Sequence, residues 1–273
     1  MKKLIVIADW ANDTLTCQEI ASAVEGFLKN PEGMKISFIS STPSTINTSF
    51  LLSQVVESEE RYGRPQNTVI FENTDPRLQT RESVKKAKGA EFIIVKLKSG
   101  IFLCGPNAGF NFSLVKDKID EIFHYEGLDK GSQFRSRDLY SRFSAHLMDS
   151  LEDELDLTEV RTDEIPTPQG YFIGHIDNYG NIKTTIRGSN VKGQFEYGDT
   201  VTVTINEITK KAKYVDNLFG GTPGELVLYP GSSGKADDPY LEVSVWRHFT
   251  EKNPTTGLDE FKHPRPGMEI FIK

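Results

Sequence analysis

The stretch Leu4-Ile5-Val6-Ile7-Ala8-Asp9 is a short apolar run that ends abruptly in a carboxylate. Its length and its β-branched residues predict a buried strand. Further apolar runs follow, and they alternate with segments whose apolar residues recur at helical spacing. We predict strands at 4–8, 35–40, 67–72 and 91–98, and helices that begin at a capping box, Thr16 to Glu19, or span 44–62 and 136–157. This alternation is typical of an α/β layer with a largely parallel sheet.

The second half of the chain has a different texture. After a proline-containing segment, Glu164 to Gln169, short strand-like runs follow one another without a helical period. These predicted strands lie at 170–175, 181–186, 200–205, 225–229, 240–246 and 268–272. We therefore expect an α/β N-terminal domain over residues 1–164 and a smaller, all-β, barrel-like C-terminal domain over residues 170–273.

Composition narrows the class of protein. The chain has 273 residues, 37% of them hydrophobic, which is enough for packed cores, and its formal net charge is −7. The negative charge argues against nucleic acid as the main partner, because phosphate binding needs a basic surface. No stretch approaches the ~20 apolar residues of a membrane span, and Asp9 ends the first apolar run too early for a signal peptide. Cys17 and Cys104 lack metal-like spacing, so we expect no metal and a reduced, cytoplasmic protein.

Three polar motifs follow or interrupt strand-like runs: Asn73-Thr74-Asp75-Pro76, Gly105 to Gly109, and Asp177 to Asn181. Each places small, turn-forming residues beside a carboxylate or an amide. Ligands of parallel sheets lie off the carboxyl ends of strands, where Asp9 and Asp75 fall. The motifs predict a site for a polar small molecule, shared between the two domains.

The order of several short segments carries a family resemblance. In chain order they are Ala8-Asp9-Trp10-Ala11, Tyr62 to Pro65, Asn73 to Arg77, Gly105 to Gly109, Gln133 to Asp138 with Ala145-His146-Leu147, and Asp177 to Asn181 with Thr184-Thr185-Ile186. They resemble the Thr-Asp-Phe-Gly, Tyr-Phe-Pro, Asp-Pro-Gly-Val-Gly, Gly-Pro-Asp-Asn-Gly, Thr-Phe-His-Gly-Arg-Asp and Asp-x-Phe-Gly-Asn motifs of the S-adenosyl-L-methionine hydrolase family. That family also contains the fluorinases and chlorinases.

The resemblance implies a fold, an assembly and a reaction. The fold is an α/β domain followed by a β-barrel, as the pattern of elements also predicts. The family forms homotrimers, with each site completed by a neighbouring chain. A nucleophile displaces methionine at C5′ of the ribose, so S-adenosyl-L-methionine is a substrate and no cofactor is expected. The sulfonium is already a good leaving group, and the protein has to align the nucleophile and exclude water.

The resemblance also implies site residues. The catalytic Asp, Arg and His of the family correspond to Asp75, Arg81 and Arg135, the last being a replacement of histidine by arginine. A guanidinium cannot act as a base near neutral pH, although it can hold an anion. The implied substrate-binding residues are Asp9, Trp10, Asn107, Asp177, Tyr179, Asn181, Tyr214 and Ser232.

Structural alternatives remain open for three of these residues. Asp9 could cap the next helix, Asp177 could belong to a plain hairpin turn, and Tyr214 could be a core residue of the barrel. Three functions remain open as well. The leading hypothesis is hydrolysis of S-adenosyl-L-methionine to adenosine and methionine. The alternatives are a halide-dependent 5′-halo-5′-deoxyadenosine synthase and a non-catalytic protein that binds adenosyl nucleosides.

Overall fold

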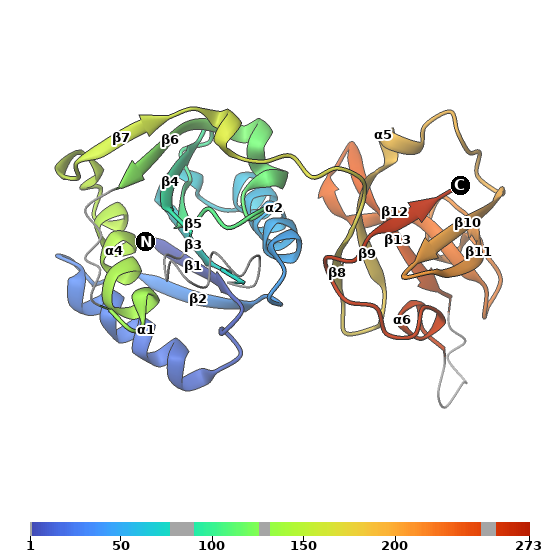
Figure 1. Ribbon diagram of the computed structural model, residues 1–273, viewed down its shortest axis with the longest axis horizontal. Helices are drawn as coiled ribbons and strands as arrows, with labels where there is room; N and C mark the ends of the chain where they lie inside the picture. Colours follow the sequence, from blue (N-terminus) through green and yellow to red (C-terminus); the bar gives the residue numbers. More distant parts are fainter. Residues whose placement is uncertain (1, 77–89, 126–131, 247–254) are drawn as a thin grey trace, which may run out of the picture. The chain divides into compact units, whose positions relative to one another are not determined.

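The computed structural model describes residues 2–76, 90–125, 132–246 and 255–273. The chain divides into two compact units, residues 1–167 and 168–273, which are described separately below (Figure 1). The expected fold class is confirmed, because the first unit is an α/β layer and the second is a barrel-like β-sheet. Within the described residues, none of the helices combines the length and apolarity that a membrane crossing requires.

The N-terminal unit is built on a seven-stranded sheet with the order β2-β1-β3-β5-β4-β6-β7. Its strands are β1 Lys3–Ala8, β2 Lys35–Ser40, β3 Thr68–Asn73, β4 Phe92–Leu97, β5 Phe102–Pro106, β6 Ile119–Tyr125 and β7 Leu157–Val160. The pairings from β2 to β5 are parallel, whereas β4 and β7 run against their neighbours. The sheet is therefore mostly parallel, but the pairings from β5 to β7 are antiparallel, which the sequence pattern did not predict.

Helices cover both faces of this sheet (Figure 1). They are α1 Thr14–Phe27, α2 Thr45–Tyr62 and α4 Ser141–Met148, with a π-helical turn at Ser136–Tyr140 and 3₁₀ turns at Pro65–Asn67, Ser113–Lys118, Glu152–Glu154 and Thr162–Glu164. Leu4 and Val6 pack with α1 and α4, while Ile5 and Ile7 pack with α2. Successive strand residues face opposite sides, so coverage of both faces explains the unbroken apolar run at 4–8.

Two predicted helix boundaries are wrong. Helix α1 begins at Thr14 with Asp13 as its N-cap, because the Asp13 carboxylate accepts the Leu15 N–H at 3.0 Å and the Thr16 hydroxyl at 2.9 Å. The helix predicted over 136–157 ends at Met148, and Ser150 lies in the left-handed region at φ 58°. The chain then forms the edge strand β7 instead of continuing the helix.

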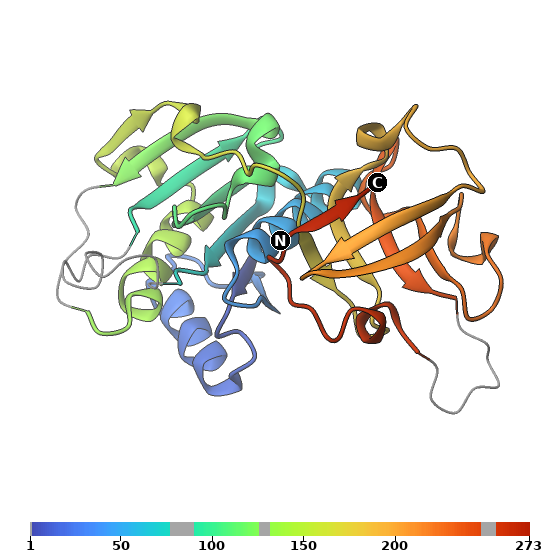
Figure 2. The same ribbon diagram turned by 45° about the vertical axis from the view of Figure 1, so that its right-hand side comes forward.

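The C-terminal unit is a second seven-stranded sheet with the order β14-β10-β11-β12-β13-β9-β8. Its elements are β8 Ile173–Ile176, β9 Ile182–Arg187, α5 Gly188–Val191, β10 Thr200–Ile205, β11 Ile208–Tyr214, a 3₁₀ turn Leu218–Gly220, β12 Leu226–Lys235, β13 Asp238–Val245, α6 Gly257–Glu260 and β14 Ile270–Ile272. The edge strands β8 and β14 come together through a bridge from Phe172 to Glu269 and the Ile173 N–H to Met268 C=O bond at 2.8 Å. The sheet therefore closes around one apolar core into a nearly complete barrel (Figure 2).

Candidate functional site

The carboxyl ends of β1 and β3 bring Asp9 and Asp75 together. Ala8 pairs with Asn73, and the Asp9 N–H donates to the Asn73 carbonyl at 3.4 Å, so both chains leave the sheet at one edge. Burial raises the pKa of the Asp9 carboxyl above its ordinary value, and the Asp75 carboxylate raises it further. Two carboxylates therefore share this edge of the sheet.

The loop that carries Asp75 is anchored on both sides. The Thr74 hydroxyl bonds to the Thr48 hydroxyl at 2.6 Å and to the Ser41 hydroxyl at 3.0 Å, at the start of α2 and after β2. The Asp75 carboxylate accepts the Ala90 N–H at 3.1 Å. These hydrogen bonds within the protein fix the position of the Asp75 carboxylate.

Arg135 belongs to the same neighbourhood. It is half-buried at the start of the π-helical turn, near the Tyr140 side chain. The next residue, Ser136, bonds to the Asn73 side chain at the end of β3. Burial raises the pKa of Tyr140, and the negative charges of Asp75 and Glu72 add to this effect while Arg135 opposes it. The structure therefore groups Asp9, Asp75 and Arg135, two acids and one fixed cation, around the end of β3.

A fully buried acid, Glu72, lies directly below this group. One carboxyl oxygen accepts the Asn111 amide at 2.9 Å and the Thr74 N–H at 3.3 Å, and the same amide reaches the carbonyls of Thr74 at 2.8 Å and Pro106 at 3.0 Å. The second oxygen has no hydrogen-bond partner among the described residues. Burial raises the pKa of Glu72 well above its ordinary value, and the charges of Asp75 and Asp9 contribute in the same direction.

Glu72→Gln should change how stability depends on pH. Because the pKa of Glu72 is raised in the folded state, its contribution is present at low pH and is lost as pH rises through that pKa. The glutamine variant lacks this loss, so its melting temperature should exceed that of the wild type at about pH 9 and match it more closely at about pH 5. Melting curves at both pH values, with the exposed Glu25→Gln as control, test this. Parallel curves for wild type and variant would show that Glu72 is ionised throughout.

Two further expected site residues of this unit have mainly structural contacts. Trp10 is half-buried and meets Phe38 and Phe134 edge-on, with ring centroids 6.5 and 6.2 Å apart. Its indole N–H is buried without a partner among the described residues. Asn107 follows β5, and its amide lies 3.5 Å from the Glu164 carbonyl. The third expected catalytic residue, Arg81, lies outside the described residues.

The motif at 177–181 forms a self-bonded turn in the C-terminal unit. One Asp177 oxygen accepts the N–H groups of Tyr179 at 2.9 Å and Asn181 at 3.1 Å, and the other accepts the Asn181 amide at 3.0 Å. The side-chain oxygen Oδ1 of Asn181 in turn accepts a hydrogen bond from the Ser244 hydroxyl. The side chain of Tyr179 is 69% exposed. This geometry favours the interpretation of Asp177 as part of a hairpin turn, with Tyr179 as the exposed group of the motif.

Ser232 lies close to this turn, whereas Tyr214 is a core residue. The Ser232 hydroxyl is 3.3 Å from the Lys183 ammonium, which itself lies 4.0 Å from Asp177. Tyr214 belongs to the apolar core of the barrel, and its ring centroid lies 4.9 Å from that of Tyr197. Burial and Tyr197 raise the pKa of Tyr214 to about 12.

Chemistry-bearing residues absent from the sequence prediction are Glu72, Asn111, Tyr140, Lys183 and Glu242. A charged residue at an inward-facing strand position is the signal that could have found Glu72 and Glu242, since carboxylates are rarely buried without partners. In the described part of the chain, no group of three or more His, Cys, Asp or Glu side chains could hold a metal ion.

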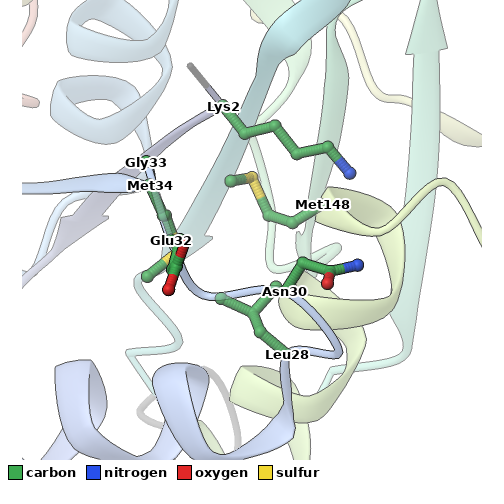
Figure 3. A pocket seen from close by; sticks show the side chains of 7 residues that line it. All are labelled: Lys2, Leu28, Asn30, Glu32, Gly33, Met34 and Met148. Carbon is green, nitrogen blue, oxygen red and sulfur yellow. The ribbon is translucent and has the colours of Figure 1, made fainter.

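The N-terminal unit also has a cavity of about 280 Å³ away from these residues. Figure 3 shows the lining side chains, which include Lys2, Met34 and Met148. Lys2 and Met34 directly precede β1 and β2, so the cavity lies at the amino ends of these strands. The candidate site lies at their carboxyl ends, and the two are separate.

Solved structures share the fold of this chain. It is similar over 99% of its length to the whole of an uncharacterized conserved protein from Thermotoga maritima, with a TM-score of 0.73 and 18% identity. A conserved hypothetical protein from Thermus thermophilus matches over 100% of both chains, with a TM-score of 0.67 and 16% identity. At these identities the likeness defines the fold alone.

A match to a protein-family model lies in the C-terminal unit. Residues 172–245 match the family model described as the SAM hydroxide adenosyltransferase C-terminal domain. The C-terminal unit is therefore similar to this family domain over residues 172–245, which confirms the resemblance drawn from the motifs for that part of the chain. No curated protein matches the sequence.

Proposed function

We propose that the protein cleaves S-adenosyl-L-methionine with water, giving adenosine and methionine. The observation that carries this proposal is the match of residues 172–245 to the SAM hydroxide adenosyltransferase family. The grouping of Asp9, Asp75 and Arg135 at one sheet edge supports it, because a nucleophile-holding site needs acceptors and a fixed cation in the same place.

The chemistry needs few protein groups. The oxygen of water attacks C5′ of the ribose, the C5′–S bond breaks, and its electron pair stays on sulfur, so methionine leaves as a neutral thioether. The attacking water loses one proton to the solvent, which leaves the neutral 5′-hydroxyl of adenosine. In this proposal Asp75 accepts a hydrogen bond from the attacking water and Asp9 binds ribose hydroxyls. Arg135 stabilises developing hydroxide charge and does not take a proton, because a guanidinium has five N–H donors and no acceptor. Arg81 is proposed as a further cation for the nucleophile.

Product analysis separates this proposal from its alternatives. Purified protein is incubated with S-adenosyl-L-methionine, with and without chloride, and the products are resolved by chromatography. Adenosine supports hydrolysis, whereas 5′-chloro-5′-deoxyadenosine would identify a halide-dependent synthase. Unchanged substrate with measurable binding would identify a non-catalytic nucleoside-binding protein.

Asp9→Ala is expected to weaken adenosine binding by about 1–3 kcal/mol, the usual cost of leaving buried polar groups unpaired. Isothermal titration calorimetry measures the change. Asp120→Ala is a matched control, since Asp120 is exposed near the start of β6, at the opposite edge of the sheet. Unchanged adenosine affinity in Asp9→Ala would rule out the ribose role and favour a structural one.

The remaining parts of the proposal concern assembly and setting. We propose a homotrimer, because the resemblance implies sites completed between chains; light scattering at micromolar concentration tests this. The cysteines at positions 17 and 104 are free thiols, which supports a reducing, cytoplasmic setting. S-adenosyl-L-methionine is the proposed substrate, and no cofactor is part of the mechanism.

A further inference from the structure

A buried ion pair joins two neighbouring strands of the C-terminal unit. Lys183 on β9 is the register partner of Glu242 on β13, and the ammonium lies 2.7 Å from the carboxylate. The two side chains are only 14% and 4% exposed. Moving two charges from water into the barrel costs free energy, and this cost can exceed the attraction between them. Stability alone therefore does not explain this ion pair.

Glu242 fixes the segment 230–234. It accepts the Ser232 N–H at 3.0 Å, the Ser232 hydroxyl at 3.4 Å and the Tyr229 hydroxyl at 3.1 Å. At position 231 only a glycine fits, because a Cβ there would lie 2.3 Å from the Glu242 side chain. The register of β12 against β13 shifts at this same segment. The regular pairing between β12 and β13 is interrupted at this bulge, and hydrogen bonds to the Glu242 carboxylate hold the segment instead.

Lys183 connects this bulge to the turn at 177–181. Its ammonium bonds to the Ser232 hydroxyl at 3.3 Å and lies 4.0 Å from the Asp177 carboxylate. Asp177 organises the turn through the N–H groups of Tyr179 and Asn181. The two segments that carry the expected ligand-binding residues of this unit other than Tyr214 thus meet at one buried cation.

We propose that Lys183 and Glu242 are positioning residues that lock the turn at 177–181 and the bulge at 230–234 into a single arrangement for ligand binding. The part that concerns ligand binding rests on the proposed function. The locking itself does not, since it follows from contacts present in the protein alone. Neither residue has to touch the ligand.

The test uses Lys183→Met, Glu242→Gln and the double variant in the full-length protein. Lys183→Met leaves a buried carboxylate unpaired and should lower the melting temperature of the C-terminal unit. The double variant removes both charges, so its melting temperature should return most of the way to that of the wild type. Lys210→Met is the control, because the Lys210–Glu260 pair has a similar contact of 2.8 Å but its side chains are 42% and 29% exposed.

Hydrogen exchange separates positioning from stability. The Ser232 and Asn181 amides should exchange about tenfold faster in both Lys183→Met and the double variant, because both lack the cation that lies against the two segments. Nucleoside affinity should stay reduced in the double variant, although its melting temperature recovers. Wild-type exchange at both segments in the double variant would overturn the proposal and leave a purely structural ion pair. A wild-type protein that binds no nucleoside would instead reject the proposed function, and the exchange data would still decide the locking.

Discussion

Arg135→Ala is expected to slow adenosine formation by about 10²–10³-fold, the loss typical of one electrostatic donor in an active site. The reason lies in the surroundings of the guanidinium, since both Arg135 and Asp75 act on the same buried Tyr140 side chain. Adenosine affinity should stay near the wild-type value, because the proposed ribose contact belongs to Asp9. Single-turnover assays with S-adenosyl-L-methionine measure the rate, and calorimetry measures the affinity.

Two further variants complete this experiment. Arg142→Ala is the matched control, because Arg142 is exposed on the following helix, α4. The rate of adenosine formation should be unchanged in this variant. Arg135→His restores the residue of the resembling family and should keep or raise the rate. If none of these proteins, wild type included, forms adenosine, the hydrolase proposal is rejected and the nucleoside-binding alternative replaces it.

Gly105→Ala should lower the free energy of unfolding of the N-terminal unit by about 1–3 kcal/mol. A Cβ at this position would lie 2.2 Å from the Glu72 carbonyl oxygen and 2.5 Å from a carboxyl oxygen of the same residue. The carbonyl belongs to the central strand β3, so relief requires moving backbone that also carries Asp75. Catalytic geometry should suffer together with stability.

Urea unfolding followed by fluorescence measures this effect. The chain has two tryptophans, so a Trp246→Phe background leaves Trp10 as the reporter of the N-terminal unit. Gly26→Ala is the control, because no atom lies within 4 Å of the added Cβ and alanine is the better helix former. Equal unfolding free energies for the two glycine variants would mean that β3 and β5 can shift apart at position 105 at little cost in free energy.

The parts of the fold that the sequence predicted are those set by local pattern. Strands β1 and β2 and helix α2 follow the apolar runs almost residue for residue, because run length and residue type are local properties. Strand β11 was missed because three lysines obscure its alternation. The antiparallel pairings of β4 with β5 and β6 were missed as well, since strand direction depends on partners distant in sequence.

The candidate site was predicted in the same uneven way. Asp9 and Asp75 were found because strand-end carboxylates are visible as motifs, and their neighbourhood is a direct result of parallel pairing. Tyr214 shows the limit of this reasoning, since an aromatic that resembles a stacking residue lies in the barrel core. Glu72 and Glu242 were overlooked because their main side-chain partners come from strands and loops 13 to 59 residues away. Only the folded chain brings such partners together.

The turn at 177–181 has a consequence for selectivity. The Asp177 oxygens already accept three hydrogen bonds from Tyr179 and Asn181, so about one of the roughly four acceptor sites of the carboxylate remains for an incoming hydroxyl or ammonium group. Any further bond has to replace a turn bond, and the free energy of such an exchange is a difference between two similar bonds that is close to zero for a well-fitting ligand. For a ligand that displaces a turn bond without replacing it, the exchange is unfavourable. In the proposed function, Asp177 therefore offers a ligand a single directed contact, and tight binding has to come from other contacts.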